Sequence, residues 1–532
     1  MSVTGGQAVV NALAAADVRV VFGIPGIHNL ALYDALFQHP TIRHLTVRHE
    51  QGGGFAADGY ARASGAIGVL LTTTGPGATN ALTPLAEAYA DSSRVLLITT
   101  GLDDDAATRE TGELHEMRNQ FALLKSVTGR AVRVQSAEEI PVALAQIIHE
   151  LRTGRPRPHV LELPISLLER SVTATGAAAT NDELPPQLSL QRLDEAASLL
   201  RSARRPLLIA GGGTVDASAE VIALAERLDA PVALTRSSRG VVPDDHPLCF
   251  GVAGDEAFKQ YLATCDLVIA VGTRFGKLWG MDRLKLPTLI HIDLEAAVIG
   301  RFYQPAVGLV ADAKAALRAL VNQLGAFRRT DEAARAAVAR LRSERVAAHH
   351  RREPRTMALV DALADALPRD VIVTHDMTIV CYAAIRLLPV YAPRSCFYPS
   401  YYGTLGFALP AALGAKLARP QRPVVALCGD GGFLFTLHEL ATAVQSQLPV
   451  TFVVFNDSCY SAIRRAEQRT YGDRIIGAEL VNPDFCLLAE SFGLRAERAS
   501  TPAALTTALR SALASDAPRL VEVAISPPLS EQ

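Results

Sequence analysis

The sequence lacks the features that mark membrane-spanning, disulfide-stabilised and nucleic-acid-binding proteins. No stretch of its 532 residues approaches the roughly 18 consecutive apolar residues that a membrane-spanning helix requires. Its seven cysteines include no CxxC pair, so neither a disulfide framework nor a zinc site is indicated. With 52 basic and 54 acidic residues the formal net charge is −2, which gives no reason to expect nucleic acid or a membrane as partner.

The N-terminal residues 1–18 also lack the basic start and the cleavage site of a signal peptide. Their pattern instead predicts an amphipathic helix, in which Thr4 and Gln7 form a capping box. Together with the unpaired cysteines, this start predicts a cytoplasmic protein.

Short apolar, β-branched runs alternate with Ala- and Leu-rich helical stretches along most of the chain. This alternation predicts an α/β protein with doubly wound parallel sheets flanked by helices. Two segments break the pattern: the polar residues 171–187, expected to be a linker, and the Arg- and Ala-rich residues 327–354, expected to be a solvated connecting helix. Three parallel-sheet domains remain, with expected limits of 1–170, 188–325 and 355–532.

Ligands of open α/β sheets bind beyond the carboxyl ends of the strands, and this sequence places its unusual residues there. In the middle unit these are Gly211–Gly213 and Gly272–Gly276. Those of the outer two units are Gly23–Gly26, Arg48–Glu50, Thr74–Gly77, Thr374–Thr378, Gly429–Gly431 and Asn456–Asp457.

One predicted strand, beginning VVALC, ends in Gly429-Asp430-Gly431-Gly432. Glycines let backbone amides approach a phosphate closely, and a following helix N-terminus adds partial positive charge. A hard cation such as Mg²⁺ can bridge a carboxylate to phosphate oxygens. A Gly-Asp-Gly turn alone is common, but the next predicted strand also ends in oxygen ligands, Asn456-Asp457. The two strand ends are expected to be neighbours and to form a diphosphate and metal site.

This arrangement resembles the signature of thiamine-diphosphate enzymes. The upstream motifs VFGIPG, RHEQGGGFAADGYARASG and LTTTGPGATNALTPLAEAYAD agree with it in order and spacing. Over nearly its full length the chain resembles the superfamily of acetolactate synthases and 2-oxo acid decarboxylases. The resemblance implies an N-terminal pyrimidine-binding domain, a central Rossmann-like domain and a C-terminal diphosphate-binding domain. It also implies thiamine diphosphate and Mg²⁺ as cofactors.

The resemblance assigns the metal ligands. Asp430 would hold Mg²⁺, and Asp457 stands where the family usually has Asn, which leaves a hard oxygen ligand with one more negative charge. The backbone carbonyl of Cys459 would be the third protein ligand. Cys459 as a thiol nucleophile is disfavoured, because no histidine partner is near it in the sequence.

Glu50 is the residue to which this resemblance assigns activation of the cofactor. In the family this glutamate hydrogen-bonds the aminopyrimidine and promotes its imino tautomer, which removes the thiazolium C2 proton. Leu405 matches the bulky residue that keeps the cofactor bent. The remaining cofactor-binding residues that the resemblance implies are Pro25, Gly26, Gly75, Pro76, Asn80, Thr378, Gly403, Gly429, Gly431 and Gly432.

Glu50 belongs to the first unit and Asp430 to the third. In the family the equivalent residues meet across a subunit interface, so the resemblance implies a homodimer with shared active sites, commonly paired into a homotetramer.

The motifs PGIHNLALYDAL, GELHEM and YPSYYGTLGF look most like the branch of 5-guanidino-2-oxopentanoate (2-ketoarginine) decarboxylases. The expected reaction is non-oxidative decarboxylation of a small 2-oxo acid through an enamine. Glu116 would then pair with a cationic substrate end, the alternative being a helix-capping or salt-bridged glutamate. His28 and His115 are candidate proton donors to the enamine, or else structural hydrogen-bonders.

Two other functions stay open at this point. An acetolactate synthase-like carboligase would join the enamine to a second carbonyl and often binds FAD in its central domain. Here Arg274-Phe-Gly-Lys277 replaces the Phe-Asp-Asp-Arg stretch typical of those enzymes, which argues against FAD. A non-catalytic regulatory homologue is the more remote alternative, and the intact Glu50, Asp430 and Leu405 argue against it.

Overall fold

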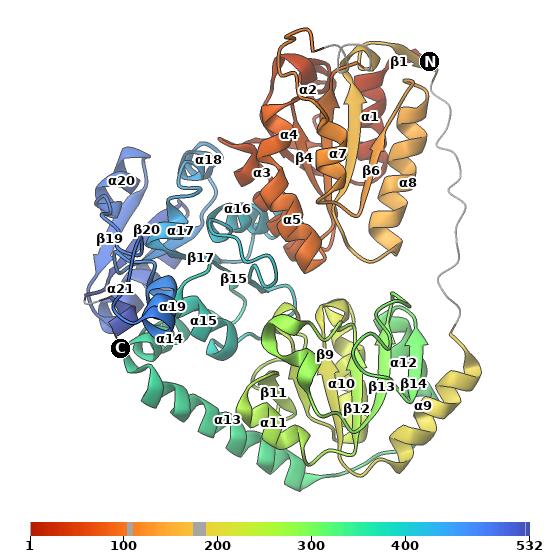
Figure 1. Cartoon of the computed structure of the whole chain (residues 1–532), viewed down its shortest axis with the longest axis vertical. Coiled ribbons are helices and arrows are strands. Elements are labelled where there is room, and N and C mark those ends of the chain that lie inside the picture. Colours follow the sequence, from red (N-terminus) through yellow and green to blue (C-terminus); the bar gives the residue numbers. More distant parts are fainter. Residues whose placement is uncertain (1, 104–109, 174–187, 527, 532) are drawn as a thin grey trace.

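The computed structural model of the chain describes residues 2–103, 110–173, 188–526 and 528–531. Three six-stranded sheets, each covered by helices, form three units, with the first and third in contact and the central one below them in Figure 1. Every strand pair within these three sheets is parallel. The predicted α/β class with three parallel sheets is confirmed.

The first sheet has the strand order β3-β2-β4-β5-β7-β6. Its central strands are buried on both faces, which is why they read as continuous apolar runs rather than alternating ones. The strands are β2 (Val20–Gly23), β3 (Arg43–Thr46), β4 (Gly68–Thr72), β5 (Val95–Gly101), β6 (Arg130–Arg133) and β7 (His159–Pro164). The helices are α1 (Gly5–Ala15), α2 (Leu30–Phe37), α3 (Glu50–Ser64), α4 (Pro76–Asn80), α5 (Leu82–Asp91), α7 (Gln120–Lys125) and α8 (Glu139–Thr153).

The central sheet has the order β11-β10-β9-β12-β13-β14, in which the strand order reverses between β9 and β12. This is the dinucleotide-fold order, with its crevice at the reversal point. The strands are β9 (Pro206–Ala210), β10 (Val232–Leu234), β11 (Cys249–Val252), β12 (Leu267–Val271), β13 (Thr288–Asp293) and β14 (Val307–Val310). The helices are α9 (Leu190–Ser202), α10 (Ser218–Leu228), α11 (Glu256–Leu262) and α12 (Ala313–Leu324).

The third sheet, β16-β15-β17-β18-β20-β19, repeats the topology of the first: in both, the strands lie in the order second, first, third, fourth, sixth, fifth. Its strands are β15 (Ile372–His375), β16 (Cys396–Phe397), β17 (Val424–Gly429), β18 (Thr451–Asn456), β19 (Arg495–Ala499) and β20 (Arg519–Ala524). Its helices are α14 (Pro354–Ala366), α15 (Ile379–Leu387), α16 (Ala408–Ala418), α17 (Asp430–Phe433), α18 (Glu439–Gln445), α19 (Ser461–Tyr471), α20 (Phe485–Ser491) and α21 (Pro502–Leu513).

The first and third units share one hydrophobic core, in which α3 lies along α16 (Figure 1). The two helices touch backbone to backbone: a Cβ on Gly59 would lie 2.1 Å from the carbonyl oxygen of Ala411, and one on Gly414 would lie 1.8 Å from that of Ala56. These two positions therefore require glycine, since any side chain would force the helices apart.

The segments between the units follow the sequence predictions in part. Residues 171–173, expected to belong to a linker, instead form β8 (Ser171–Thr173), because the edge of β1 (Ser2–Thr4) pairs with it in antiparallel fashion. The rest of that expected linker, 174–187, lies outside the described residues. The Arg-rich connection is the helix α13 (Glu332–Arg352), as predicted. The predicted capping box of Thr4 and Gln7 is present at the start of α1.

All seven cysteines are free, as the absence of a pairing pattern predicts. In the described part of the chain no helix has the length and apolar character that crossing a bilayer requires.

Candidate active site

The third sheet places two polar strand ends side by side. β17 ends at Gly429 and β18 at Asn456, and they pair in parallel with Gly429 opposite Phe455. Asp430 and Asp457, which follow these ends, therefore lie at one edge of the sheet. The neighbouring strand ends that the spacing of the motif predicts are confirmed.

Asp430 is a buried carboxylate held in one orientation. Its Oδ1 accepts a hydrogen bond of 2.8 Å from the backbone N–H of Gly431, and its Oδ2 accepts one of 2.7 Å from Nδ2 of Asn482. Burial, followed by the nearby charge of Asp457, raises the pKa of Asp430 to about 6. A carboxylate with these surroundings is stabilised in its charged form by a cation.

Asp457 is also buried, and burial raises its pKa. Its Oδ2 accepts hydrogen bonds from Oγ of Ser461 at 2.6 Å and from the backbone N–H of Leu529 at 3.0 Å. The start of the short 3-10 helix Leu529–Glu531 thus packs against the second predicted metal ligand. Cys459 is buried and its thiol pKa is raised by burial, which makes it a poor nucleophile, as the sequence predicts.

These carboxylates form a donor set that fits a hard divalent cation. Asp430 and Asp457 are close enough for their charges to interact, and both are shielded from water. Oxygen ligands of this kind suit Mg²⁺, whose two positive charges offset those of two buried carboxylates. The predicted ligands therefore fit the predicted metal.

Thr378 and the glycines of the motif are neighbours. A Cβ on Gly429 would lie 3.1 Å from Cβ of Thr378, the residue that precedes α15. A Cβ on Gly431 would lie 2.3 Å from the ring of Tyr460, and one on Gly432 would lie 3.0 Å from Oδ2 of Asp376. The glycines thus let the turn pack closely against its own protein neighbours at the strand end.

The loop that carries Leu405 is fixed from both sides. The backbone N–H of Gly406 donates to Oδ2 of Asp376 at 3.0 Å, while the carbonyl of Gly406 accepts from Oγ1 of Thr436 at 2.9 Å. Gly403 and Gly406 have positive φ angles of 74° and 80°, which favour glycine at both positions. Burial raises the pKa of Asp376 to about 7. The sequence predicted Leu405 and Gly403 here but gave Asp376 no role.

The second group of predicted residues lies in the first unit, around Glu50. Glu50 is the first residue of α3 and is buried, and its Oε2 accepts a hydrogen bond of 2.9 Å from Nδ2 of Asn80. A Cβ on Gly77 would lie 3.4 Å from its Oε1. The charge of Glu50 helps burial to raise the pKa of Tyr33, so this tyrosine is a further neighbour that the sequence did not reveal.

The two glycine turns of the first unit meet beside this carboxylate. Gly26 packs against Thr73, since a Cβ on Gly26 would lie 2.8 Å from that side chain. Gly75 precedes Pro76 with φ +66°, and its backbone N–H donates to Oε1 of Gln120 at 2.6 Å. Gly77 of the second turn lies near both Thr73 and Glu50, so the structure places Gly26, Asn80 and the helix that Pro76 begins close to Glu50.

His28 and His115 lie next to each other. Their ring centroids are 5.1 Å apart in an edge-to-face arrangement. Burial, followed by the charge of His115, lowers the pKa of His28, although the charge of Glu113 partly opposes this.

Glu116 is engaged by the backbone of its own loop. Its two oxygens accept hydrogen bonds from the backbone N–H groups of Thr111 at 3.1 Å and Gly112 at 2.7 Å. In this structure Glu116 stabilises a turn.

The group around Glu50 and the group around Asp430 are separate within one chain. Glu50 has Tyr33, Gly77 and Asn80 as its neighbours, all from the first unit. Across the described ranges, no hydrogen bond or ion pair joins these residues to the group around Asp430. One chain thus presents two groups of predicted cofactor-binding residues, here called half-sites.

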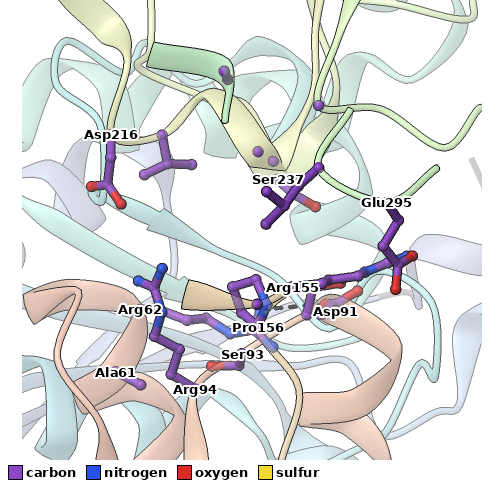
Figure 2. Close-up of a pocket in the computed structure, with 18 of the residues that line it drawn as sticks. Ala61, Arg62, Asp91, Ser93, Arg94, Arg155, Pro156, Asp216, Ser237 and Glu295 are labelled. Carbon is purple, nitrogen blue, oxygen red and sulfur yellow. Dashed lines mark hydrogen bonds and ion pairs between the residues drawn. The ribbon is translucent and has the colours of Figure 1, made fainter. Parts of the chain in front are cut away.

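A large cavity of about 1220 Å³ lies where all three units meet (Figure 2). It opens at the carboxyl ends of the central sheet, where a dinucleotide fold binds its ligand. Charged side chains from different units pair across it: Arg155 with Glu295 at 2.5 Å, and Arg394 with Asp216 at 2.7 Å. Tyr401 stacks under the guanidinium of Arg274 at 4.0 Å.

The glycine turn beside this cavity has a packing explanation. A Cβ on Gly211 would lie 2.1 Å from the carbonyl oxygen of Gly272, and a Cβ on Gly213 would lie 2.9 Å from the Cα of Gly272. Two backbone segments meet here without room for side chains. The turn therefore requires glycine whether or not a nucleotide binds.

Three models of protein families match the chain in order. They are described as the N-terminal TPP binding domain, the central domain and the C-terminal TPP binding domain of thiamine pyrophosphate enzymes, where pyrophosphate is another word for diphosphate. The matched residues are 3–123, 193–320 and 376–523.

Curated proteins are similar to the chain over most of its length. The probable 2-ketoarginine decarboxylase AruI of Pseudomonas aeruginosa is 39% identical over 505 residues, which cover 92% of this chain and 89% of that protein. Acetolactate synthase isozyme 2 large subunit of Escherichia coli is 34% identical, with 98% and 95% covered. The probable acetolactate synthase large subunit of Methanocaldococcus jannaschii is 33% identical, with 98% and 92% covered.

Proposed function

Because the chain belongs to the thiamine pyrophosphate enzymes, we propose that its two half-sites together catalyse the non-oxidative decarboxylation of a 2-oxo acid. The observation that carries this proposal is the pair of oriented, buried carboxylates: Glu50, held by Asn80, and Asp430, held by Asn482. The similarity to a decarboxylase over 92% of the chain supports the reaction class.

Thiamine diphosphate would supply the carbanion chemistry, and the chain would hold and orient it. On the proposed roles, Asp430, Asp457 and the carbonyl of Cys459 would hold Mg²⁺, which would supply positive charge for the diphosphate. The turn of Gly429, Gly431 and Gly432, together with Thr378, lies against the same group. Glu50 binds the aminopyrimidine, with Pro25, Gly26, Gly75, Pro76 and Asn80 around it, and Leu405 with Gly403 shapes the bend.

We propose that two chains complete the active site as a homodimer, and that dimers pair into a tetramer. Large apolar side chains are exposed in the segments that carry both half-sites, which supports a covering partner. On the Glu50 side these are Ile27, Leu30 and Leu114, and on the Asp430 side they are Tyr402, Phe435 and Ile463. Sedimentation of dilute protein, with turnover measured in the same samples, tests this: a fully active monomer would contradict it.

The proposed substrate is a 2-oxo acid with a guanidino group, which the name of the Pseudomonas aeruginosa relative suggests. A guanidinium in a pocket requires a carboxylate partner, and Glu116 lies next to His115 in the sequence. In the structure Glu116 is engaged by two backbone N–H groups, so it would have to share its oxygens with the substrate. A Glu116→Gln variant tests this role: if Glu116 binds the substrate, KM rises for the guanidino acid and stays unchanged for pyruvate.

An acetolactate synthase-like carboligase is the second candidate. Its support is the 34% and 33% identity to two acetolactate synthase subunits over 98% of the chain. A panel of 2-oxo acids with Mg²⁺ and thiamine diphosphate distinguishes the two, with CO₂ and the organic product measured together. A decarboxylase releases one aldehyde for each CO₂, whereas a carboligase yields an acyloin. No turnover of any acid would refute both and favour a regulatory homologue.

We further propose that the central domain works without FAD. The glycine turn has a packing explanation, ion pairs from neighbouring units cross the cavity, and the usual acidic and Arg residues are missing from Arg274–Lys277. A flavin spectrum in protein purified without added cofactor would contradict this proposal.

We propose domains close to the expected limits of 1–170, 188–325 and 355–532, with the first extended to residue 173 because β8 pairs with β1. The three sheets, which span 20–164, 206–310 and 372–524, support them. The cytoplasm is the proposed location, which seven free cysteines support.

A further inference from the structure

Glu439 is a buried carboxylate of the third unit that faces the first. It begins α18, and its side chain is fully enclosed. Its Oε1 accepts hydrogen bonds from the backbone N–H groups of Arg48 at 3.0 Å and His49 at 3.1 Å. A carboxylate from one unit therefore binds the backbone of another.

The two N–H groups that it binds immediately precede Glu50. The first backbone N–H groups of a helix have no partners within the helix and must find them elsewhere. Nδ1 of His49 accepts from the N–H of Gln51, so side chains supply the acceptors around the start of α3. Glu439 provides the acceptor for the two residues before Glu50, and so fixes where α3 starts.

The contact leaves no space for other arrangements. A Cβ on Gly52 would lie 2.2 Å from Oε1 of Glu439, so the first turn of α3 has room for this carboxylate only because residue 52 is glycine. On its other side, Oε2 of Glu439 accepts a hydrogen bond of 2.5 Å from Oγ1 of Thr442. Both carboxylate oxygens are engaged, which holds the side chain in one rotamer.

Glu439 is also connected to the half-site of its own unit. The backbone N–H of Glu439 donates to the carbonyl of Thr436. The hydroxyl of Thr436 in turn donates to the carbonyl of Gly406, the residue after Leu405. The segment from Asp430 through α17 to α18 therefore carries a proposed metal ligand at one end and the anchor of α3 at the other.

From these contacts we infer that Glu439 is a positioning residue, which holds Glu50 in place from the diphosphate-binding unit of the same chain. This inference rests on the proposed function, in which Glu50 of one chain serves the cofactor bound at Asp430 of the other. It follows that each third unit takes part in both active sites of the dimer: it binds one cofactor and positions the glutamate for the other.

The experiment compares Glu439→Ala with Glu439→Gln in the full chain loaded with Mg²⁺ and thiamine diphosphate. Exchange of the thiazolium C2 proton for deuterium, followed by NMR, reports on Glu50 independently of turnover, and calorimetry reports cofactor affinity. We expect Glu439→Ala to slow exchange by about 10- to 100-fold, since small misplacements have effects of this size. Glu439→Gln should restore most of it, because its amide oxygen accepts the same two hydrogen bonds.

Two further variants keep the test clear. In Gly52→Ala the added methyl group would displace the Glu439 carboxylate and leave the side chain of Glu50 unchanged, so exchange should slow. This variant tests the proposal even if Glu439→Ala does not fold. Gln445→Ala removes another hydrogen bond between these segments, the one from Arg48 at 2.6 Å, and as a matched control should leave exchange unchanged.

A parallel measurement on Glu50→Gln separates the two claims. If Glu50→Gln slows exchange while Glu439→Ala and Gly52→Ala exchange like the unmodified protein, the positioning role is wrong and the proposed function stands. If Glu50→Gln itself has no effect on exchange, the proposed function is wrong.

Discussion

Oε2 of Glu50 and Nδ2 of Asn80 form a hydrogen bond of 2.9 Å at the edge of the first sheet. Asn80 ends α4, the helix that follows the Gly75-Pro76 turn, so the turn and the carboxylate are held in one arrangement. This bond fixes the direction in which the carboxylate points.

The first prediction concerns this carboxylate. Replacing Glu50 by Gln keeps its shape and removes its charge, so cofactor binding should survive while turnover of the 2-oxo acid falls by about 100-fold or more. Steady-state kinetics and calorimetry on the same sample check both parts. Asn80→Ala, which loosens the carboxylate without removing it, should have a smaller effect. Undiminished turnover by Glu50→Gln would remove the basis of the proposed mechanism.

The second prediction concerns the metal site. Asp430→Ala removes a buried carboxylate whose partner Asn482 is already oriented toward it, so Mg²⁺-dependent uptake of thiamine diphosphate should be lost. Asp457→Asn keeps an oxygen ligand and removes one charge, so uptake should persist with altered Mg²⁺ affinity. Calorimetric titrations with and without Mg²⁺ distinguish the two variants. Equal uptake by Asp430→Ala and the unmodified protein would show that the metal binds elsewhere.

The third prediction addresses the histidine pair. His28 and His115 lie 5.1 Å apart between ring centroids, and the charge of His115 contributes to the lowered pKa of His28. If they donate the product proton, His28→Gln and His115→Gln should each lower kcat by about 10- to 100-fold. The double variant should cost less than the product of the two effects, because the residues act together. Single variants with unchanged kcat would leave both histidines a structural role.

The fourth prediction concerns the contact of α3 with α16. Alanine has the higher helix propensity, by about 1 kcal/mol, so Gly414→Ala should stabilise an isolated helix. Its Cβ would lie 1.8 Å from the carbonyl oxygen of Ala56, however, and we expect the free energy of unfolding to fall by about 1–3 kcal/mol or more. Gln51→Ala, on the outer part of α3, is the matched control in denaturant titrations. A stabilised Gly414→Ala variant would mean that the helices separate freely.

The fifth prediction uses the pH dependence of stability. Glu87 is fully buried and lies 3.7 Å from Nη2 of Arg62, which is already paired with Asp58 at 2.8 Å and Asp91 at 3.3 Å. Burial, followed by the charge of Asp91, raises the pKa of Glu87 well above its ordinary value of 4.5. The folded protein therefore keeps the proton at neutral pH, whereas the unfolded chain releases it.

For a carboxyl with a raised pKa in the folded state, stability is lost as the pH rises above the unfolded value toward the folded one. Glu87→Gln has no proton to lose, so it should be more stable than the unmodified protein at pH 8, by about 1–3 kcal/mol. At pH 4 the advantage should disappear. Thermal unfolding at fixed protein concentration measures both, and an advantage that does not change with pH would contradict the assignment.

The positions of the strand ends could be predicted from the sequence for a physical reason. Asp430 and Asp457 follow strands that pair in parallel, and parallel strands bring their carboxyl ends to one edge of the sheet whatever the conformation of the loops. The glycines could also be predicted to lie at close contacts of the backbone. A Cβ on Gly431, for example, would lie 2.3 Å from the ring of Tyr460.

The partners of these residues were not predictable from a single sequence. Asn482 holds Asp430 from a loop, where no periodicity shows which way a side chain points. Glu439 looks like any polar residue at the start of a helix, and only the packing of the first unit on the third reveals its role. The direction of Glu116, toward a turn rather than a pocket, depends on a loop conformation that its composition does not set.

At Gly59 and Gly414, α3 and α16 meet without any side chain between them that could slide or change rotamer. The first and third units of one chain are therefore closely packed along these two helices and share one hydrophobic core. Motions that open a path for a small molecule would then involve the surface loops or, in the proposed dimer, a shift of these two units against the second chain.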